Sequence, residues 1–187
     1  MNQIIDTTWG NVQNRIEDGY IVSSEKTLVF LFSMEFMKLK ECDFECYELD
    51  FEANIYGDVD SADTFLDLKI EDKKENKNYA LEFKFPRQTL NGNSNQTETR
   101  KKVYKDIARL KYLKEKKGFT EGFFLMMTNE MPYINSSNTR DNIYDTSDNH
   151  EGNLLNFRED YDIVNLNFKF EWIRKTKYNY LKVMRVT

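Results

Sequence analysis

Two acidic residues and a lysine interrupt neighbouring runs of alternating apolar residues in this sequence. Asp67 lies within the run 64–70, and Glu82 and Lys84 lie within the run 79–85. Both runs have the period of two that is typical of β-strands, in which successive side chains point to opposite faces. Glu82 and Lys84 are therefore expected on one face of their strand. Carboxylates are ligands that hard metal ions prefer, and a lysine carries a positive charge that suits phosphate.

The two runs are expected to pair as an antiparallel hairpin, because the polar connection between them is short. If Asp72 and Lys77 close the hairpin with 73–76 as its loop, Asp67 stands directly opposite Glu82. Side chains paired in this way lie about 5 Å apart at Cβ. The opposite face is then expected to carry Leu66, Leu68, Ile70, Leu81, Phe83 and Phe85.

Two facing carboxylates repel each other unless a cation lies nearby. A divalent ion such as Mg²⁺ or Mn²⁺ resolves that conflict, since it accepts one or two carboxylates and fills its other positions with water and substrate phosphate oxygens. Lys84 then either contacts the scissile phosphate or orients and deprotonates the attacking water. This combination of residues predicts phosphodiester hydrolysis.

Other interpretations of the same residues remain open. Asp67 and Glu82 could face solvent on a half-exposed sheet, with Lys84 in a surface ion pair. A rival metal site would use Asp67-x-Lys69 with an upstream acid, namely Asp58, Asp60 or Asp63.

Composition narrows the chemistry further. The chain has 187 residues, of which 40% are hydrophobic, and this predicts a single domain over 1–187 with its own core. Cys42 and Cys46 are the only cysteines and His150 is the only histidine, which excludes a disulfide scaffold and a four-ligand Cys/His zinc site. The sequence shows no signal peptide and no apolar run long enough to span a bilayer, so we expect a cytoplasmic protein without membrane contact.

The net charge of −5 conceals an asymmetry along the chain. Residues 1–80 carry eight Lys and Arg against eighteen Asp and Glu, whereas 81–187 carry nineteen against fourteen. A basic helix is predicted over 99–117, ended by Gly118, and it presents Lys101, Lys105 and Arg109 on one face. That face is either solvated or contacts the phosphates of a polyanion.

Other elements follow from hydrophobic period and length. The first 23 residues have a mixed pattern, with a turn signal at Asp18-Gly19. The expected elements are a helix over 24–40, strands over 47–53, 120–128, 166–172 and 178–186, and a long polar loop over 135–162 that holds His150.

The segments FLDLKI and YALEFKF, followed by TRKKVYKDIARLKYL, resemble the PD-(D/E)xK nuclease superfamily, the restriction-endonuclease-like fold. The resemblance covers about residues 24–128. It implies an α/β core with the order α-β-β-β-α-β, in which helices flank a mixed central sheet, with C-terminal strands added. The sequence departs from the motif in having no proline before Asp67.

The resemblance also implies roles for individual residues. Asp67 and Glu82 would bind Mg²⁺ or Mn²⁺ together with the backbone carbonyl of Phe83, and Lys84 would assist the water. A glutamate on the first helix of the core is matched by Glu25, with Glu35 as the alternative. A contact between substrate and Gln88, which follows the motif strand, is a further expectation from the sequence.

The sequence thus leads us to expect a metal-dependent nuclease acting on DNA, in restriction, defence or repair. The resemblance implies products with a 5′-phosphate and a 3′-hydroxyl. The basic residues near 100–117 would hold the DNA backbone. Specificity would need the 135–162 loop, the C-terminal strands, a homodimer or a partner subunit. Two alternatives are a catalytically inactive protein of this fold that binds a partner through its acidic surface, and a small-molecule or tRNA-processing hydrolase.

Overall fold

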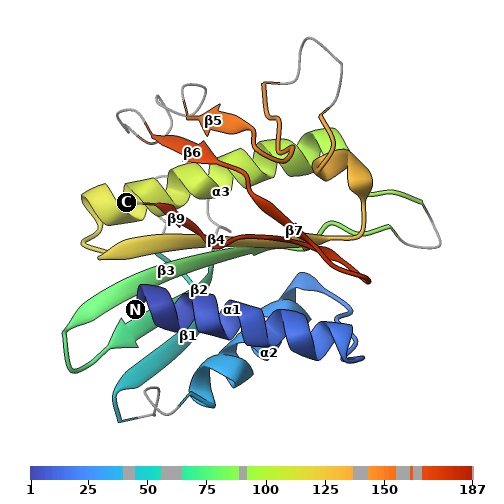
Figure 1. Ribbon diagram of the computed structural model, residues 1–187. Coiled ribbons are helices and arrows are strands. Elements are labelled where there is room, and N and C mark those ends of the chain that lie inside the picture. The colour runs from blue at the N-terminus through green and yellow to red at the C-terminus, as the bar shows by residue number, and fades with distance from the viewer. Residues whose placement is uncertain are drawn as a thin grey trace.

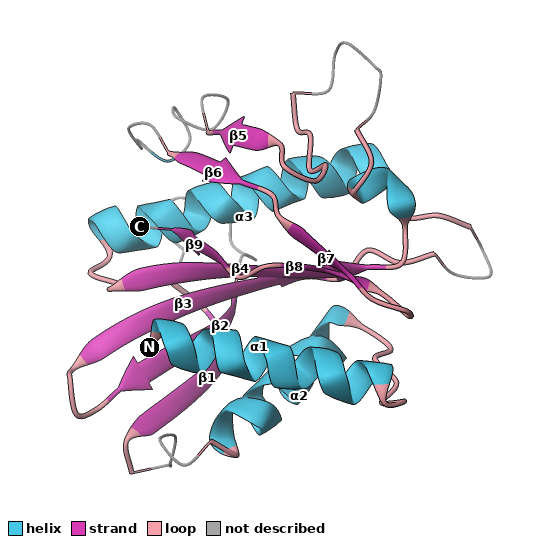
Figure 2. Ribbon diagram, viewed as in Figure 1, coloured by secondary structure: helices cyan, strands magenta, loops and turns pink. Residues whose placement is uncertain are grey.

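Helices cover both faces of a mixed β-sheet in the computed structural model (Figures 1 and 2). The structure describes residues 1–39, 45–55, 65–88, 92–136, 143–154, 161 and 166–186. Helices α1 (Asn2–Glu17) and α2 (Glu25–Met37) lie on one face, and α3 (Gln96–Lys116) lies on the other. The protein therefore belongs to the α/β class, as the sequence predicts.

The main sheet has seven strands in the order β1-β2-β3-β4-β8-β7, with β9 also paired to β4. Its strands are β1 (Tyr47–Ala53), β2 (Leu66–Asp72), β3 (Lys77–Lys84), β4 (Glu121–Thr128), β7 (Trp172–Arg174), β8 (Asn179–Leu181) and β9 (Met184–Val186). A separate pair, β5 (Glu151–Asn153) and β6 (Asn167–Lys169), packs against α3, where the rings of Phe168 and Tyr104 are 5.2 Å apart. A short 3₁₀ turn, η1 (Met131–Tyr133), follows β4.

Local sequence signals explain where the predicted helices begin and end. The Ser24 hydroxyl accepts a hydrogen bond from the backbone N–H of Thr27, which caps the start of α2. Asn95 caps α3 in the same way, so this helix begins three residues earlier than predicted. Gly118, with a φ of 72°, takes the left-handed conformation that commonly ends a helix.

The predicted hairpin forms in the predicted register. Asp72 pairs with Lys77, and the ladder continues to Leu68 opposite Leu81, which brings Asp67 and Glu82 together at its end. Strand β4 then pairs parallel with β3, and α3 forms the crossover between them.

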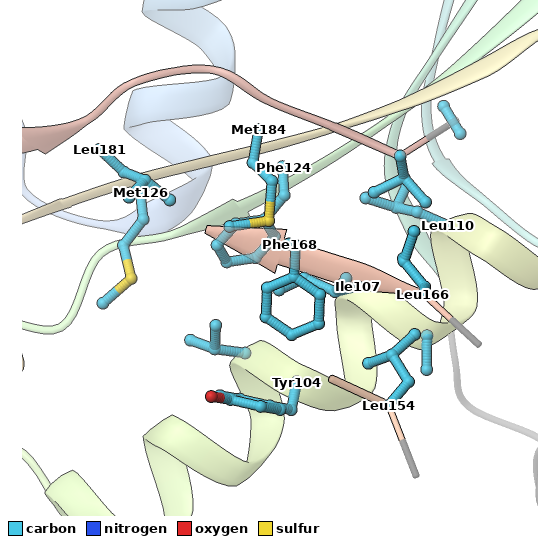
Figure 3. Packing of buried hydrophobic residues seen from close by; sticks show 14 of the residues in the cluster. Tyr104, Ile107, Leu110, Phe124, Met126, Leu154, Leu166, Phe168, Leu181 and Met184 are labelled. Carbon is cyan, nitrogen blue, oxygen red and sulfur yellow. The ribbon is translucent and has the colours of Figure 1, made fainter. Parts of the chain in front are cut away.

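Two hydrophobic clusters form the core, one on each face of the sheet. The cluster shared with α1 and α2 takes Leu68, Leu81 and Phe83 from the hairpin. The cluster beneath α3 contains Ile107 and Phe124 and is shown in Figure 3. Both faces of β4 are buried, which explains why its sequence is almost uninterrupted by polar residues.

The structure differs from the expected strand faces at the start of β2. Leu66 belongs to the cluster beneath α3, together with its partner Ala53, and not to the face that carries Leu68. Between Phe51 and Ala53, Glu52 has a φ of 51°, which breaks the regular alternation of β1. The change of face in both strands coincides with this residue.

Three expectations for the two ends of the chain were wrong. The segment 1–23, for which only a mixed pattern and a turn were expected, contains α1, whose buried face carries Ile5, Trp9, Val12 and Ile16. The turn predicted at Asp18-Gly19 follows this helix. The long loop expected over 135–162 contains β5, which pairs with β6. Each of the two long C-terminal strands is divided into two short ones, β6 and β7 and then β8 and β9, because the chain turns between them.

Candidate active site

The predicted acids and lysine meet at the end of the β2–β3 hairpin, between the start of α2 and the middle of α3. Asp67 is the second residue of β2, and Glu82 and Lys84 lie at the end of β3. Glu25 is the first residue of α2 and reaches the same place from the other face of the sheet. The structure thus brings together all four residues predicted to be catalytic.

Lys84 is the centre of this group. Its Nζ atom lies 2.7 Å from Asp106 Oδ2 and 3.4 Å from Glu25 Oε1, and it donates a hydrogen bond of 2.9 Å to the carbonyl oxygen of Phe83. The lysine is largely buried, with 14% of its side chain exposed. Its position is therefore fixed by three oxygen atoms, one each from α3, α2 and β3.

Backbone amides hold two of the carboxylates in place. Asp67 Oδ2 accepts a hydrogen bond of 2.7 Å from the N–H of Phe83, and Glu25 Oε2 accepts one of 2.9 Å from the N–H of Phe85. Glu82 is buried beside Asp67 and forms a side-chain hydrogen bond with it. The backbone of β3 therefore orients Asp67 of β2, and the residue that follows the strand orients Glu25 of α2.

Burial raises the pKa of Glu82 well above its ordinary value, and the neighbouring charges of Asp106 and Asp67 raise it further. Burial also raises the pKa of Asp67 and of Glu25, although Lys84 counteracts part of the effect. The site therefore has more carboxyl groups than its cations can keep ionised. Protonated Glu82 can donate its proton to Asp67 in the hydrogen bond between them.

The pKa of Lys84 is raised as well, and for a lysine this favours the charged form. Burial alone would lower its pKa, but the carboxylates of Asp106, Glu25, Asp67 and Glu82 outweigh burial and raise the pKa above its ordinary value. Lys84 is consequently a firmly charged ammonium group. In this setting it can attract an anion, but it is a poor proton acceptor.

Asp106 is the residue of the site that the sequence analysis missed. It lies on α3, is buried, and pairs with both Lys84 and Arg109, the latter at 3.0 Å. Asp106 lies between Val103 and Leu110 on the apolar stripe of the helix, and this position is the sequence feature that could have identified it. An acid on the buried side of a helix usually has a partner, and here the partner is the motif lysine.

The carboxylates around Lys84 include possible ligands for the metal implied by the resemblance. No three acidic, histidine or cysteine side chains converge closely enough to hold an ion by themselves in the part of the chain that the structure describes. Asp67, Glu82 and the Phe83 carbonyl nevertheless offer neighbouring hard oxygen donors, and two carboxylates suffice for Mg²⁺ when water completes its shell. The raised pKa of each carboxyl group indicates that a nearby cation would stabilise its ionised form. These oxygen donors are therefore of the type that Mg²⁺ or Mn²⁺ prefers.

The other predicted site residues are placed differently. Lys101 is exposed on α3 and Lys105 is half-buried, whereas Arg109 is engaged with Asp106 and has only 13% of its side chain exposed. The three therefore do not form one uniform exposed basic face. Gln88 is exposed beyond the end of β3, where its backbone N–H donates to Asn129.

Two alternative site residues lie elsewhere. Glu35 is buried near the end of α2 and pairs with Arg15 and Lys38, so Glu25 is the helix glutamate at the site. In the rival motif, Lys69 pairs with Glu71 at 3.1 Å. The acids expected to complete it, Asp58, Asp60 and Asp63, lie outside the described residues, as does Cys42.

Comparisons with known proteins found no match to this chain among family models, curated proteins or solved structures. Among the described helices, none combines the length and apolar character needed to cross a membrane.

Proposed function

We propose that this protein is a metal-dependent nuclease that hydrolyses phosphodiester bonds in DNA, as its resemblance to the PD-(D/E)xK superfamily implies. The observation that carries the proposal is the convergence of Asp67, Glu82 and Lys84 at the end of one hairpin, in the predicted register. The restriction-endonuclease-like fold is part of the same proposal, and the order of α2, three strands, α3 and β4 supports it.

In this proposal Asp67, Glu82 and the carbonyl of Phe83 hold Mg²⁺ or Mn²⁺. The bound ion supplies an activated water and stabilises charge on the phosphate. Lys84 directs its ammonium group at the scissile phosphate, and its raised pKa favours this role over deprotonation of the water. Glu25 and Asp106 keep Lys84 charged and oriented, and Lys101 contacts the DNA backbone from the exposed side of α3.

Calorimetry with Mn²⁺ and a DNA cleavage assay test the proposal together. The parent protein should bind Mn²⁺ and cleave DNA only in its presence. Asp67→Asn should lose both properties, because the amide retains the shape of the carboxylate but not its charge. Glu71→Gln is the matched control on the same strand, since Glu71 pairs with Lys69 outside the site. If Asp67→Asn cleaves DNA as well as the parent does, the assignment of the site is wrong.

A second candidate function is that of a non-catalytic binding subunit with the same fold. The 2.7 Å contact between Lys84 and Asp106 favours it, because this pair gives the lysine a partner within the protein. In that case the parent protein should show no heat of binding with Mn²⁺, and Asp67→Asn should behave as the parent does.

A further inference from the structure

A cavity of about 410 Å³ opens directly beside the candidate active site. It is lined by Glu25, Lys26, Val29, Phe51, Glu52 and Asp67. Glu25 and Asp67 belong to the candidate active site, so a group bound in the cavity would lie next to the phosphate that is proposed to react. The volume falls within the range typical of small-molecule pockets.

The backbone is strained where β1 contributes to this cavity. Glu52 has a φ of 51°, a left-handed conformation that is costly for a residue other than glycine. In a regular strand the side chains of Phe51 and Glu52 would point to opposite faces, yet both line the cavity. Strain of this kind persists where the surrounding structure enforces it, and such places are often functional.

The walls of the cavity combine an aromatic surface with carboxylates. Phe51 is 47% exposed, which is unusual for a phenylalanine, and Val29 adds apolar surface beside it. Glu52 pairs with Lys26 at 2.6 Å, and its carboxylate and those of Glu25 and Asp67 give the cavity an acidic edge. Three carboxylates against one lysine disfavour a phosphate group here. They favour a flat, uncharged ring that donates hydrogen bonds, and nucleobases with amino or imino groups have this chemistry.

We propose that this cavity receives one unpaired nucleobase, stacked on Phe51, from the strand that is cut at the adjacent site. The inference rests on the proposed nuclease function and specifies its substrate. A base within a duplex is paired and stacked and cannot enter unless it is extruded. The preferred substrate is therefore single-stranded nucleic acid, or a strand with an unpaired nucleotide at the site of cleavage.

The first experiment measures stacking without relying on catalysis. Phe51→Trp places an indole in the cavity, while both natural tryptophans, Trp9 and Trp172, are buried. With Ca²⁺ in place of Mg²⁺, titration with a single-stranded oligodeoxynucleotide should quench the added fluorescence, and the matched duplex should quench it far less. An oligoribonucleotide of the same sequence shows whether the sugar is also distinguished. Equal quenching by single strand and duplex, or none by either, would overturn the inference.

The second experiment compares two exposed phenylalanines. Phe51→Ala should weaken binding of the single-stranded oligonucleotide about tenfold, the size expected when one base loses its aromatic stacking partner. Phe51→Tyr should bind as the parent does. Phe65→Ala is the control, because Phe65 is 43% exposed and lines neither this cavity nor the neighbouring groove that Phe30 shares with Phe51. Equal binding by Phe51→Ala and Phe65→Ala would contradict the inference.

These results separate the inference from the proposed function. Cleavage of duplex DNA with no dependence on Phe51 would leave the nuclease proposal standing and remove the nucleobase pocket. Quenching by single strands in a protein that cleaves nothing would support the pocket and remove the catalytic proposal.

Discussion

At the level of single residues, the candidate active site places Lys84 among four carboxyl groups, from Glu25, Asp67, Glu82 and Asp106. Arg109 adds a positive charge beside this group, because it pairs with Asp106. Three of the carboxyl groups have a raised pKa, which makes the stability of the folded protein depend on pH.

The sign of that dependence follows from Glu82. In the unfolded chain this residue loses its proton near the ordinary pKa of 4.5, whereas the folded protein keeps the proton to higher pH. Between the two values the folded state binds more protons, so the free energy of unfolding falls as pH rises. The raised pKa of Lys84 lies above the neutral range, and its stabilising contribution stays constant there.

We therefore predict that, in the presence of a chelator, Glu82→Gln is more stable than the parent at about pH 8 and similar to it at about pH 4. The gain should appear only at the higher pH, because there the parent must either ionise this buried carboxyl group or hold its proton against the surrounding pH. Urea denaturation at both pH values measures it. Glu71→Gln should show no such gain. A loss of stability in Glu82→Gln at the higher pH would contradict the expected cost of ionising this group.

At the level of elements, the site depends on how closely α3 approaches the sheet. Gly122 of β4 lies against this helix, and a Cβ added there would come within 2.8 Å of Cβ of Leu110. Asp106 lies one helical turn from Leu110, so the contact with glycine also sets the distance between Asp106 and Lys84.

Gly122→Ala should destabilise the protein by about 1–3 kcal/mol, the usual cost of overpacking a core. It should also reduce activity by moving Asp106. Gly10→Ala is the matched control, because Gly10 lies within α1 and an added Cβ would meet nothing within 4 Å. This control should gain up to about 1 kcal/mol through better helix propensity. Thermal denaturation of both variants decides the matter, and a tolerated Gly122→Ala would mean that α3 can shift without cost.

The alternation of apolar and polar residues predicted the strands of the hairpin, because each face of β2 and β3 packs against a single layer of the structure. The register followed from one short turn, and it placed Asp67 beside Glu82 as the structure does. Helix α1 was missed although Ile5, Trp9, Val12 and Ile16 have helical spacing, since polar residues and Gly10 dilute that pattern.

The contribution of Asp106 could not be read in the same way. Its role depends on the distance to Lys84, which only the docking of α3 on the sheet determines. The cavity beside Phe51 could not be predicted from the sequence pattern either. The left-handed conformation of Glu52 interrupts the alternation of side chains on which the prediction of β1 rests.

At the level of the whole molecule, the charge asymmetry predicts how DNA binding responds to ions. The protein has a net charge of −5, and its site is rich in carboxylates. Without divalent metal, binding of labelled DNA should be weak and should fall steeply as salt rises, because contacts from lysine and arginine dominate it.

Fluorescence anisotropy over a salt series measures this dependence, and adding Ca²⁺ should strengthen binding at every salt concentration. Lys101→Ala should make the plot of log affinity against log salt shallower by about one, as expected for the loss of one phosphate contact. Tight binding that is insensitive to salt would contradict the proposed contact.

The pairing of β4 has a consequence for synthesis of the chain. This strand is bordered on one side by β3 and on the other by β8 and β9, which come from the last part of the sequence described. While the ribosome makes the residues in between, β4 can dock on β3 but keeps an open edge of largely apolar residues. The nascent protein is exposed to aggregation during that interval, until residues 179–186 emerge and close the edge.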